Sequence, residues 1–233
     1  MKKKFLIIIA IIILILLGII GYYVFIDMQQ EEKLETELTE ISNLTNAETI
    51  DIDAINETLK RTVTTGDYAV VEQAFKQYLK DNFDNSIQIA EILNDEKITN
   101  LLTVENYKAD GKEFVETKNY IASTRDTLEN CKNKYTEFFT EEKAMSYIND
   151  KGLDSYYIDL YKQKYVGDIE TENNDKTVEN AIDEIISILN KSEEVINFLI
   201  ENQNSWEIRG ENIVFNSESL SDEYDQLVEN VLE

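Results

Sequence analysis

Residues 5–26 restrict the possible folds of this chain more than any other segment. They form a run of 22 residues without a single charge, composed mainly of Ile and Leu. A helix of this length covers about 33 Å, which is close to the thickness of the hydrocarbon core of a bilayer. In that core each backbone N–H and C=O group must find its hydrogen-bond partner within the segment. The run therefore predicts a transmembrane helix.

The charges on either side of this run predict its orientation. Three lysines, residues 2–4, precede it, and the acidic residues Asp27 and Glu31 follow it. Basic residues are retained on the cytoplasmic side of a membrane, so we expect residues 1–4 to be a cytoplasmic tail and residues 5–26 to be a single-pass anchor. The bulk of the chain would then be extracellular, at the outer face of the cell membrane.

A cleaved signal peptide is the alternative interpretation of the same segment. Such a peptide also begins with basic residues followed by an apolar run. Its apolar part is usually shorter, however, and residues 21–26, Gly-Tyr-Tyr-Val-Phe-Ile, offer no cleavage site built from small residues. An uncleaved anchor is therefore the expected arrangement.

The composition excludes several classes of protein. The chain has no His and a single Cys, so it cannot form an internal disulfide, a zinc site of His and Cys, or a catalytic site that relies on imidazole. Residues 2–4 account for three of the 22 basic residues, so residues 27–233 carry 19 bases against 47 acids and a net charge of −28. Nucleic acid is not an expected partner, because its phosphates would repel this charge. The same repulsion applies to anionic lipid headgroups.

The absence of proline from all 233 residues favours long, uninterrupted helices. We expect residues 27–50 to form a helical stalk and a loop, and residues 51–233 to form an extracytoplasmic helical domain. The strongest helical patterns lie in 112–139 and 177–203, where apolar or small residues recur in steps of three and four, as is typical of antiparallel helix packing. The expected seam positions are Phe114, Thr117, Ile121, Thr124, Leu128, Cys131, Tyr135 and Phe138 in the first segment, and Val178, Ile182, Ile185, Leu189, Ser192, Ile196, Leu199 and Gln203 in the second.

Shorter elements are expected around these two helices. Thr140 and Asp154 are suited to cap the helices that follow them, because a side-chain oxygen can accept hydrogen bonds from the free N–H groups of a first turn. Residues 206–215 alternate apolar and polar positions on either side of Gly210, which is typical of a short hairpin. The predicted fold class is therefore mainly α: an N-terminal transmembrane helix, then an antiparallel helical bundle with a short C-terminal β-hairpin.

With these features the chain resembles uncharacterised single-pass, extracytoplasmic helical membrane proteins of Gram-positive bacteria. The residues behind the resemblance are the N-terminal anchor of Lys, Ile and Leu and three further segments, 61–68, 150–154 and 206–215. No activity is known for these proteins. The resemblance therefore implies a location in the cell envelope and no particular chemistry.

Carboxylates are the only abundant reactive groups of the chain. A carboxylate-dependent hydrolase needs two of them about 5–9.5 Å apart, one with a raised pKa, and no pattern distinguishes such a pair among the 47 acids. Asp51 and Asp53 begin like a calcium loop, but the Gly that such a loop needs at its sixth position is missing. Cys131 lies on the apolar seam of its helix, which favours a buried structural thiol over a reactive one. We therefore predict no catalytic residue, no metal site and no cofactor.

A cluster of tyrosines is the feature that most favours a contact surface. Tyr156 and Tyr157 are followed by Tyr161 and Tyr165 at four-residue spacing, and the only tryptophan is Trp206. Such side chains are common at protein interfaces and can stack on sugar rings. The alternative is that the tyrosine stripe packs on a neighbouring helix and that Trp206 closes the end of the bundle.

The expected function is that of a non-enzymatic binding or scaffolding component of the cell envelope, with another protein, a second copy of the chain or a wall component as partner. Two alternatives stay open. A carboxylate-dependent cell-wall hydrolase would have a concave site with a buried, unpaired Asp or Glu. An accessory subunit of a membrane complex would depend on the anchor itself, where Gly18 and Gly21 allow another helix to approach.

Overall fold

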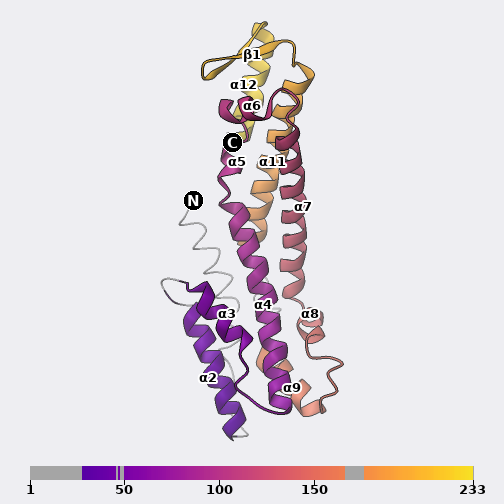
Figure 1. Cartoon of the computed structure of the whole chain (residues 1–233). Helices are drawn as coiled ribbons and strands as arrows, with labels where there is room; N and C mark the ends of the chain where they lie inside the picture. The colour runs from indigo at the N-terminus through magenta and orange to yellow at the C-terminus, as the bar shows by residue number, and fades with distance from the viewer. Residues whose placement is uncertain (1–27, 46, 48–49, 166–175, 233) are drawn as a thin grey trace. The chain divides into compact units, whose positions relative to one another are not determined.

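The computed structural model describes residues 28–45, 47, 50–165 and 176–232 (Figure 1). Within these ranges the chain is mainly helical and has a short two-stranded antiparallel hairpin near its C-terminus, which confirms this part of the predicted fold class. The chain divides into two compact units. Unit 1 consists of Met1–Ala90 and Cys131–Val178, and unit 2 consists of Glu91–Asn130 and Glu179–Glu233.

Unit 1 combines the N-terminal helices with segments from the middle of the chain. Its described elements are α2 (Met28–Thr45), α3 (Ile52–Lys60), most of α4 (Asp67–Leu93), the end of α7 (Val115–Phe138), α8 (Glu141–Ser146), α9 (Ser155–Tyr165) and the first two residues of α11 (Thr177–Glu201). Its core includes Leu34 of α2, Phe75 of α4 and Tyr161 of α9, all of which are fully buried.

Unit 2 contains the hairpin and the C-terminal helix. Its described elements are the end of α4, α5 (Glu96–Asn100), α6 (Val104–Asp110), the first part of α7, most of α11, β1 (Trp206–Arg209), β2 (Asn212–Phe215) and α12 (Glu218–Leu232). The strands pair antiparallel with Trp206 opposite Phe215. Gly210 has a φ of +66° in the two-residue turn, a conformation that glycine adopts without strain.

The two expected seams form the buried faces of α7 and α11. All eight positions named for the first seam are buried. In the second seam, six positions are buried, and Ile185 and Gln203 are half-buried. The three-and-four spacing therefore identified the inward faces of both helices correctly.

Helix ends follow the expected capping chemistry in part. Thr140 accepts a hydrogen bond from the N–H of Lys143 at 3.2 Å, and Asp154 accepts one from the N–H of Tyr156 at 3.2 Å. Both predicted caps are therefore confirmed. Three caps were not predicted, at Asp51, Asp95 and Thr103, which precede α3, α5 and α6.

The start of α7 differs from the prediction. The helix begins at Val115 rather than near residue 112, because Gly111 and Phe114 both have positive φ values, of 74° and 49°. The carboxylate of Asp110 accepts hydrogen bonds from the N–H groups of Glu116 and Thr117 at 3.0 and 2.7 Å. The first turn of α7 is therefore capped by the last residue of α6, a helix that the apolar spacing did not predict.

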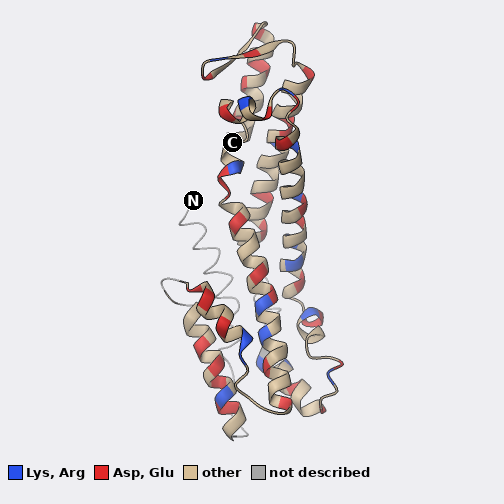
Figure 2. Cartoon of the chain, in the orientation of Figure 1, with Lys and Arg blue, Asp and Glu red and all other residues tan. Residues whose placement is uncertain are grey.

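The segment expected as a stalk contributes to unit 1. Leu34, Leu38 and Ile41 of α2 are buried, and the preceding residues 1–27, with the predicted tail and anchor, lie outside the described residues. Within the ranges that the structure describes, none of the helices is both long enough and apolar enough to cross a membrane. Acidic side chains are spread over the helices of both units, with fewer basic ones between them (Figure 2).

Candidate functional site

A buried ionic cluster joins α2 and α4 in unit 1. The ammonium group of Lys76 lies 2.6 Å from Glu37 Oε1 and 2.7 Å from Glu72 Oε1. Glu72 also accepts hydrogen bonds from the hydroxyl and the N–H of Thr64, at 2.6 and 2.9 Å. Arg61 donates two hydrogen bonds to the carboxylate of Glu37, at 2.8 and 2.7 Å. Both buried glutamates therefore have several partners.

The pKa values of these two carboxyl groups follow from their partners. Burial by itself would raise the pKa of Glu37, but the hydrogen bonds from Arg61 and Lys76 outweigh burial and lower it below the ordinary 4.5. Burial by itself would also raise the pKa of Glu72, but the hydrogen bonds from Lys76 and Thr64 outweigh burial and lower this pKa as well. Because both groups are ionised and fully engaged, the cluster is suited to holding α2 against α4 and not to proton transfer.

A second polar arrangement in unit 1 is a cleft of about 300 Å³ between α4, the end of α7 and α8. Its α4 side presents four polar residues at positions 81, 84, 85 and 88, which share one face of the helix. The lining residues are Asp81, Asp84, Asn85, Gln88, Lys134, Phe138, Lys143 and Tyr147. Both signs of charge, two amides and two aromatic rings thus meet at one concave surface.

The two carboxylates of the cleft already have partners. Asp81 accepts hydrogen bonds from the hydroxyl of Tyr147 at 2.7 Å and from the amide of Gln77 at 2.6 Å. Asp84 forms an ion pair with Lys80 one turn earlier in α4. Burial and the hydrogen bond to Asp81 both raise the pKa of Tyr147, so its phenol stays protonated and continues to donate.

Two lysines and one amide oxygen of the cleft lack an ion-pair or hydrogen-bond partner among the described residues. Within the described residues, Lys134 and Lys143 have no carboxylate within ion-pair distance. The ammonium of Lys143 stands 5.4 Å from the ring centre of Phe138 and 5.8 Å from that of Tyr147, in a cation–π arrangement. Asn85 donates to the carbonyl of Cys131 at 3.0 Å, but its side-chain oxygen is buried without a hydrogen-bond partner.

The oxygen of Asn85 is buried and therefore not open to a ligand in the cleft, and its lack of a donor is unfavourable by about 1–3 kcal/mol. The groups that the cleft offers to an anionic or carbonyl-bearing ligand are the two ammonium groups of Lys134 and Lys143. Phe138 and Tyr147 add apolar surface to the same wall. The described residues contain no group of three or more acidic or Cys side chains placed to hold a metal ion.

The tyrosines predicted as a contact surface lie in different surroundings. Tyr156 is 47% exposed, whereas Tyr161 is fully buried and donates its hydroxyl to the carbonyl of Ala144 at 2.9 Å. Tyr157 is half-buried, and its ring centre lies 5.2 Å from that of Tyr68 in an edge-to-face contact. The side chain of Tyr165 lies outside the described residues. Among the members of this cluster whose side chains the structure describes, Tyr156 is the most exposed.

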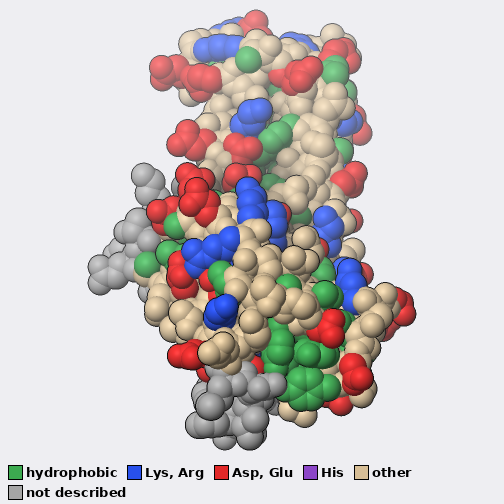
Figure 3. All heavy atoms as spheres, turned by 60° about the horizontal axis from the view of Figure 1, so that its bottom comes forward, with side chains coloured by type: hydrophobic (Ala, Val, Ile, Leu, Met, Phe, Trp, Pro, Cys, Tyr) green, Lys and Arg blue, Asp and Glu red, His purple; other side chains and the backbone are tan. Residues whose placement is uncertain are grey.

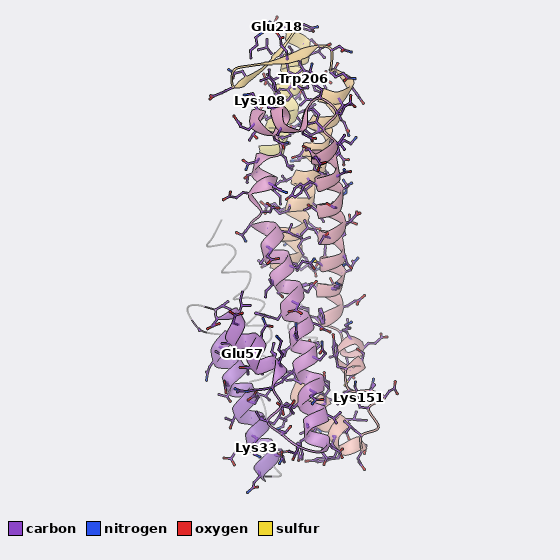
Figure 4. All side chains as sticks on the ribbon, in the orientation of Figure 1. Lys33, Glu57, Lys108, Lys151, Trp206 and Glu218 are labelled. Carbon is purple, nitrogen blue, oxygen red and sulfur yellow. The ribbon has the colours of Figure 1, made fainter. Side chains whose placement is uncertain are left out.

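Trp206 lies in unit 2 and is 4% exposed (Figure 4). Its indole N–H donates to the carbonyl of Leu199 at 2.8 Å, and its ring lies 6.2 Å from that of Phe114. Lys112 stands 4.5 Å above the ring and donates to the carbonyl of Trp206 at 2.6 Å. These contacts correspond to the packing alternative for Trp206, at the core of unit 2.

The residues of the cleft were not singled out by the sequence pattern. A row of Asp, Asn and Gln on one face of a helix is typical of a solvated surface, and the approach of Lys143 and Tyr147 depends on packing. Comparison of the chain with known protein families, curated proteins and solved structures gave no match. The geometry of unit 1 therefore carries the argument for function.

Proposed function

We propose that this chain is a membrane-anchored, extracytoplasmic helical protein that acts as a non-enzymatic binding or scaffolding component of the cell envelope. In this proposal residues 5–26 cross the membrane once as a helix and residues 1–4 are cytoplasmic. The helices after residue 27 form an antiparallel bundle outside the cell. The uncharged run of 22 residues behind three lysines supports this location.

The observation that carries a binding function is the unequal pairing of polar groups at the unit 1 cleft. Asp81 and Asp84 are engaged by neighbours, while Lys134 and Lys143 have no ion-pair partner among the described residues. A hydrolase uses one carboxyl as a proton donor and a second as base or nucleophile. A binding site instead needs a few convergent polar groups whose bonding capacity is still open.

In-cell photo-crosslinking of the full-length protein tests this proposal. A photoreactive amino acid at Gln88, which lines the cleft, should give a recurrent adduct that mass spectrometry identifies. The same amino acid at Glu229, an exposed position of α12, is the matched control. Adducts of equal yield and identity at both positions would contradict the cleft as the binding site.

A second pair of variants tests the role of the lysines. Substitution of both Lys134 and Lys143 by Met should reduce the Gln88 adduct, because the ligand would lose both ammonium groups. Substitution of the exposed Lys151 by Met should leave the adduct unchanged.

Recovery of the protein from the culture medium instead of the membrane fraction would contradict the proposed anchor.

The cleft also brings two carboxyl groups to one surface, and this observation keeps the hydrolase alternative open. Purified full-length protein and its Asp81→Asn and Asp84→Asn variants can be incubated with isolated cell walls. Release of soluble fragments by the unmodified protein, abolished by either substitution, would favour the hydrolase over the binding proposal.

A further inference from the structure

The beginning of α9 lies next to the beginning of α2 in unit 1. The hydroxyl of Tyr156 lies 3.4 Å from Glu31 Oε1, and the ammonium of Lys164 lies 3.2 Å from Glu35 Oε1. Residue numbers increase in the same direction along both helices at these two contacts. The N-terminal end of α9 is therefore the end nearest the first turn of α2.

The first turn of α2 lies close in the chain to the proposed anchor. Met28 follows Ile26 by two positions, which span at most about 7 Å, and helical rise adds about 4.5 Å from Met28 to Glu31. The Cα of Glu31 therefore lies within about 12 Å of the end of the apolar run, whatever path the chain takes. The headgroup region on each side of a bilayer core is about 5–8 Å thick. The Glu31 side chain and its 3.4 Å contact add about 8 Å, so the Tyr156 hydroxyl lies within about 20 Å of the end of the apolar run, a range that includes the headgroup region.

The surface at this end is suited to such a location. Tyr156 exposes 47% of its surface, and its ring packs edge-to-face on Tyr157 with ring centres 5.1 Å apart. Hydrophobic side chains gather on the face of unit 1 that Figure 3 brings forward. Two exposed charges of opposite sign belong to the same two segments: Lys33 on α2, labelled in Figure 4, and Asp154, which accepts a hydrogen bond from the N–H of Tyr156. Tyrosine with charges of both signs matches the amphipathic, zwitterionic interface of a bilayer.

We propose that the N-terminal end of α9, through Tyr156, contacts the lipid headgroup layer of the membrane that holds residues 5–26. This inference rests on the proposed anchor. The contact needs little affinity of its own, because the anchor keeps the tyrosine at high effective concentration beside the bilayer. It is therefore compatible with a net charge of −28 that repels the rest of the domain from anionic lipid.

Depth-dependent fluorescence quenching tests the contact on the full-length chain. The protein is reconstituted into phosphatidylcholine vesicles with and without bromine atoms high on the acyl chains. Tyr156→Trp reports on the proposed contact, and Phe25→Trp reports on insertion of the anchor. Ile52→Trp is the matched control, since Ile52 is 44% exposed but begins α3, which follows the far end of α2 (Figure 1). The signal of the unmodified protein gives the background from Trp206.

The expected result is bromine-dependent loss of fluorescence for Phe25→Trp and Tyr156→Trp, with an emission shift to the blue for the latter on reconstitution, and no change for Ile52→Trp. Quenching of Phe25→Trp alone would contradict the proposed headgroup contact and would still support the anchor. Equal quenching of Tyr156→Trp and Ile52→Trp would also overturn it, because the approach would not be specific to this end. Absence of quenching for Phe25→Trp would remove the anchor and this inference with it.

Discussion

The ammonium group of Lys76 lies 2.6 Å from a carboxylate oxygen of Glu37, and the two side chains are only 2% and 3% exposed. The pair joins α4 to α2 across 39 positions of sequence. Glu72 completes the arrangement from the preceding turn of α4, 2.7 Å from the same ammonium. The first described helix is therefore held in unit 1 by a buried ionic contact as well as by its apolar face.

Replacing Lys76 with Met should lower the free energy of unfolding by about 3–5 kcal/mol, because Glu37 and Glu72 would remain buried without their shared counter-charge. Lys80→Met is the matched control one turn later, where the lysine pairs with the exposed Asp84. We expect a loss below about 0.5 kcal/mol there. Urea unfolding of the full-length protein in detergent, followed by circular dichroism, measures both. Similar losses of unfolding free energy for the two variants would show that the buried ion pair contributes no more stability than the exposed one.

Acidification should remove part of the stability that this cluster provides. The folded-state pKa values of Glu37 and Glu72 are lower than the ordinary 4.5, so below about pH 4.5 the unfolded chain binds more protons than the folded one. The contribution is present above that pH and is lost as the pH falls through the folded-state values.

The variant Glu72→Gln isolates this effect from the other acids of the chain. It should start less stable than the unmodified protein at pH 7 and lose less stability between pH 7 and pH 3, because one of the two titrating groups is gone. Asp84→Asn, at an exposed pair, should follow the unmodified protein. If the free energy of unfolding of Glu72→Gln fell with pH in parallel with that of the unmodified protein, the lowered pKa assigned to Glu72 would be contradicted.

Two buried asparagines of α4 should respond differently to the same substitution. Both polar side-chain atoms of Asn82 are buried without partners, whereas Asn85 donates to the carbonyl of Cys131 at 3.0 Å. Leucine at either position changes the volume equally, but only Asn85→Leu breaks a hydrogen bond and leaves that carbonyl without its side-chain donor. We therefore expect Asn82→Leu to be more stable than Asn85→Leu by about 1–3 kcal/mol in thermal or urea unfolding. The reverse order would indicate that Asn82 has a bound partner in solution.

The thiol of Cys131 should react slowly while the protein is folded. Burial raises its pKa, an effect that the nearby Lys134 only partly opposes, and its sulfur lies 3.3 Å from the side-chain oxygen of Gln88. An aromatic disulfide reagent at pH 7 should therefore modify it only on unfolding. A Thr136→Cys variant adds an exposed thiol to the same helix and should show one fast and one slow reaction. Two fast reactions would show that Cys131 is accessible.

The helices of this protein were largely predictable because their information is local. The spacing of Ile121, Leu128 and Tyr135 selected the buried face of α7, and Thr140 marked the start of α8 before any packing was known. The prediction for the start of α7 was wrong by three residues, because Asp110 caps the helix across Gly111 and Phe114, both in the left-handed region of backbone conformation. Periodicity carries no signal for such a turn.

The candidate sites were less predictable. The predicted contact surface included Tyr156 and Tyr161 alike, yet the first is exposed and the second is fully buried. Four-residue spacing places Tyr157 and Tyr161 on one stripe and leaves Tyr156 beside it, but it does not state which of these positions a neighbouring helix covers. The cleft was missed altogether, because the polar residues of α4 at 84, 85 and 88 have the pattern of an ordinary solvated face.

By itself the sequence determined the helical character, the seams of α7 and α11, the hairpin around Gly210 and the uncharged run at residues 5–26. These follow from the period of apolar residues and from turn chemistry, both of which act within a few positions. Only the tertiary structure decided which charges are buried and which polar groups meet. Lys76 with Glu37, and Tyr147 with Asp81, are 39 and 66 positions apart. Whether such groups form a salt bridge, line a cleft or remain in solvent depends on the packing of whole helices, because burial and distance set the strength of each polar contact.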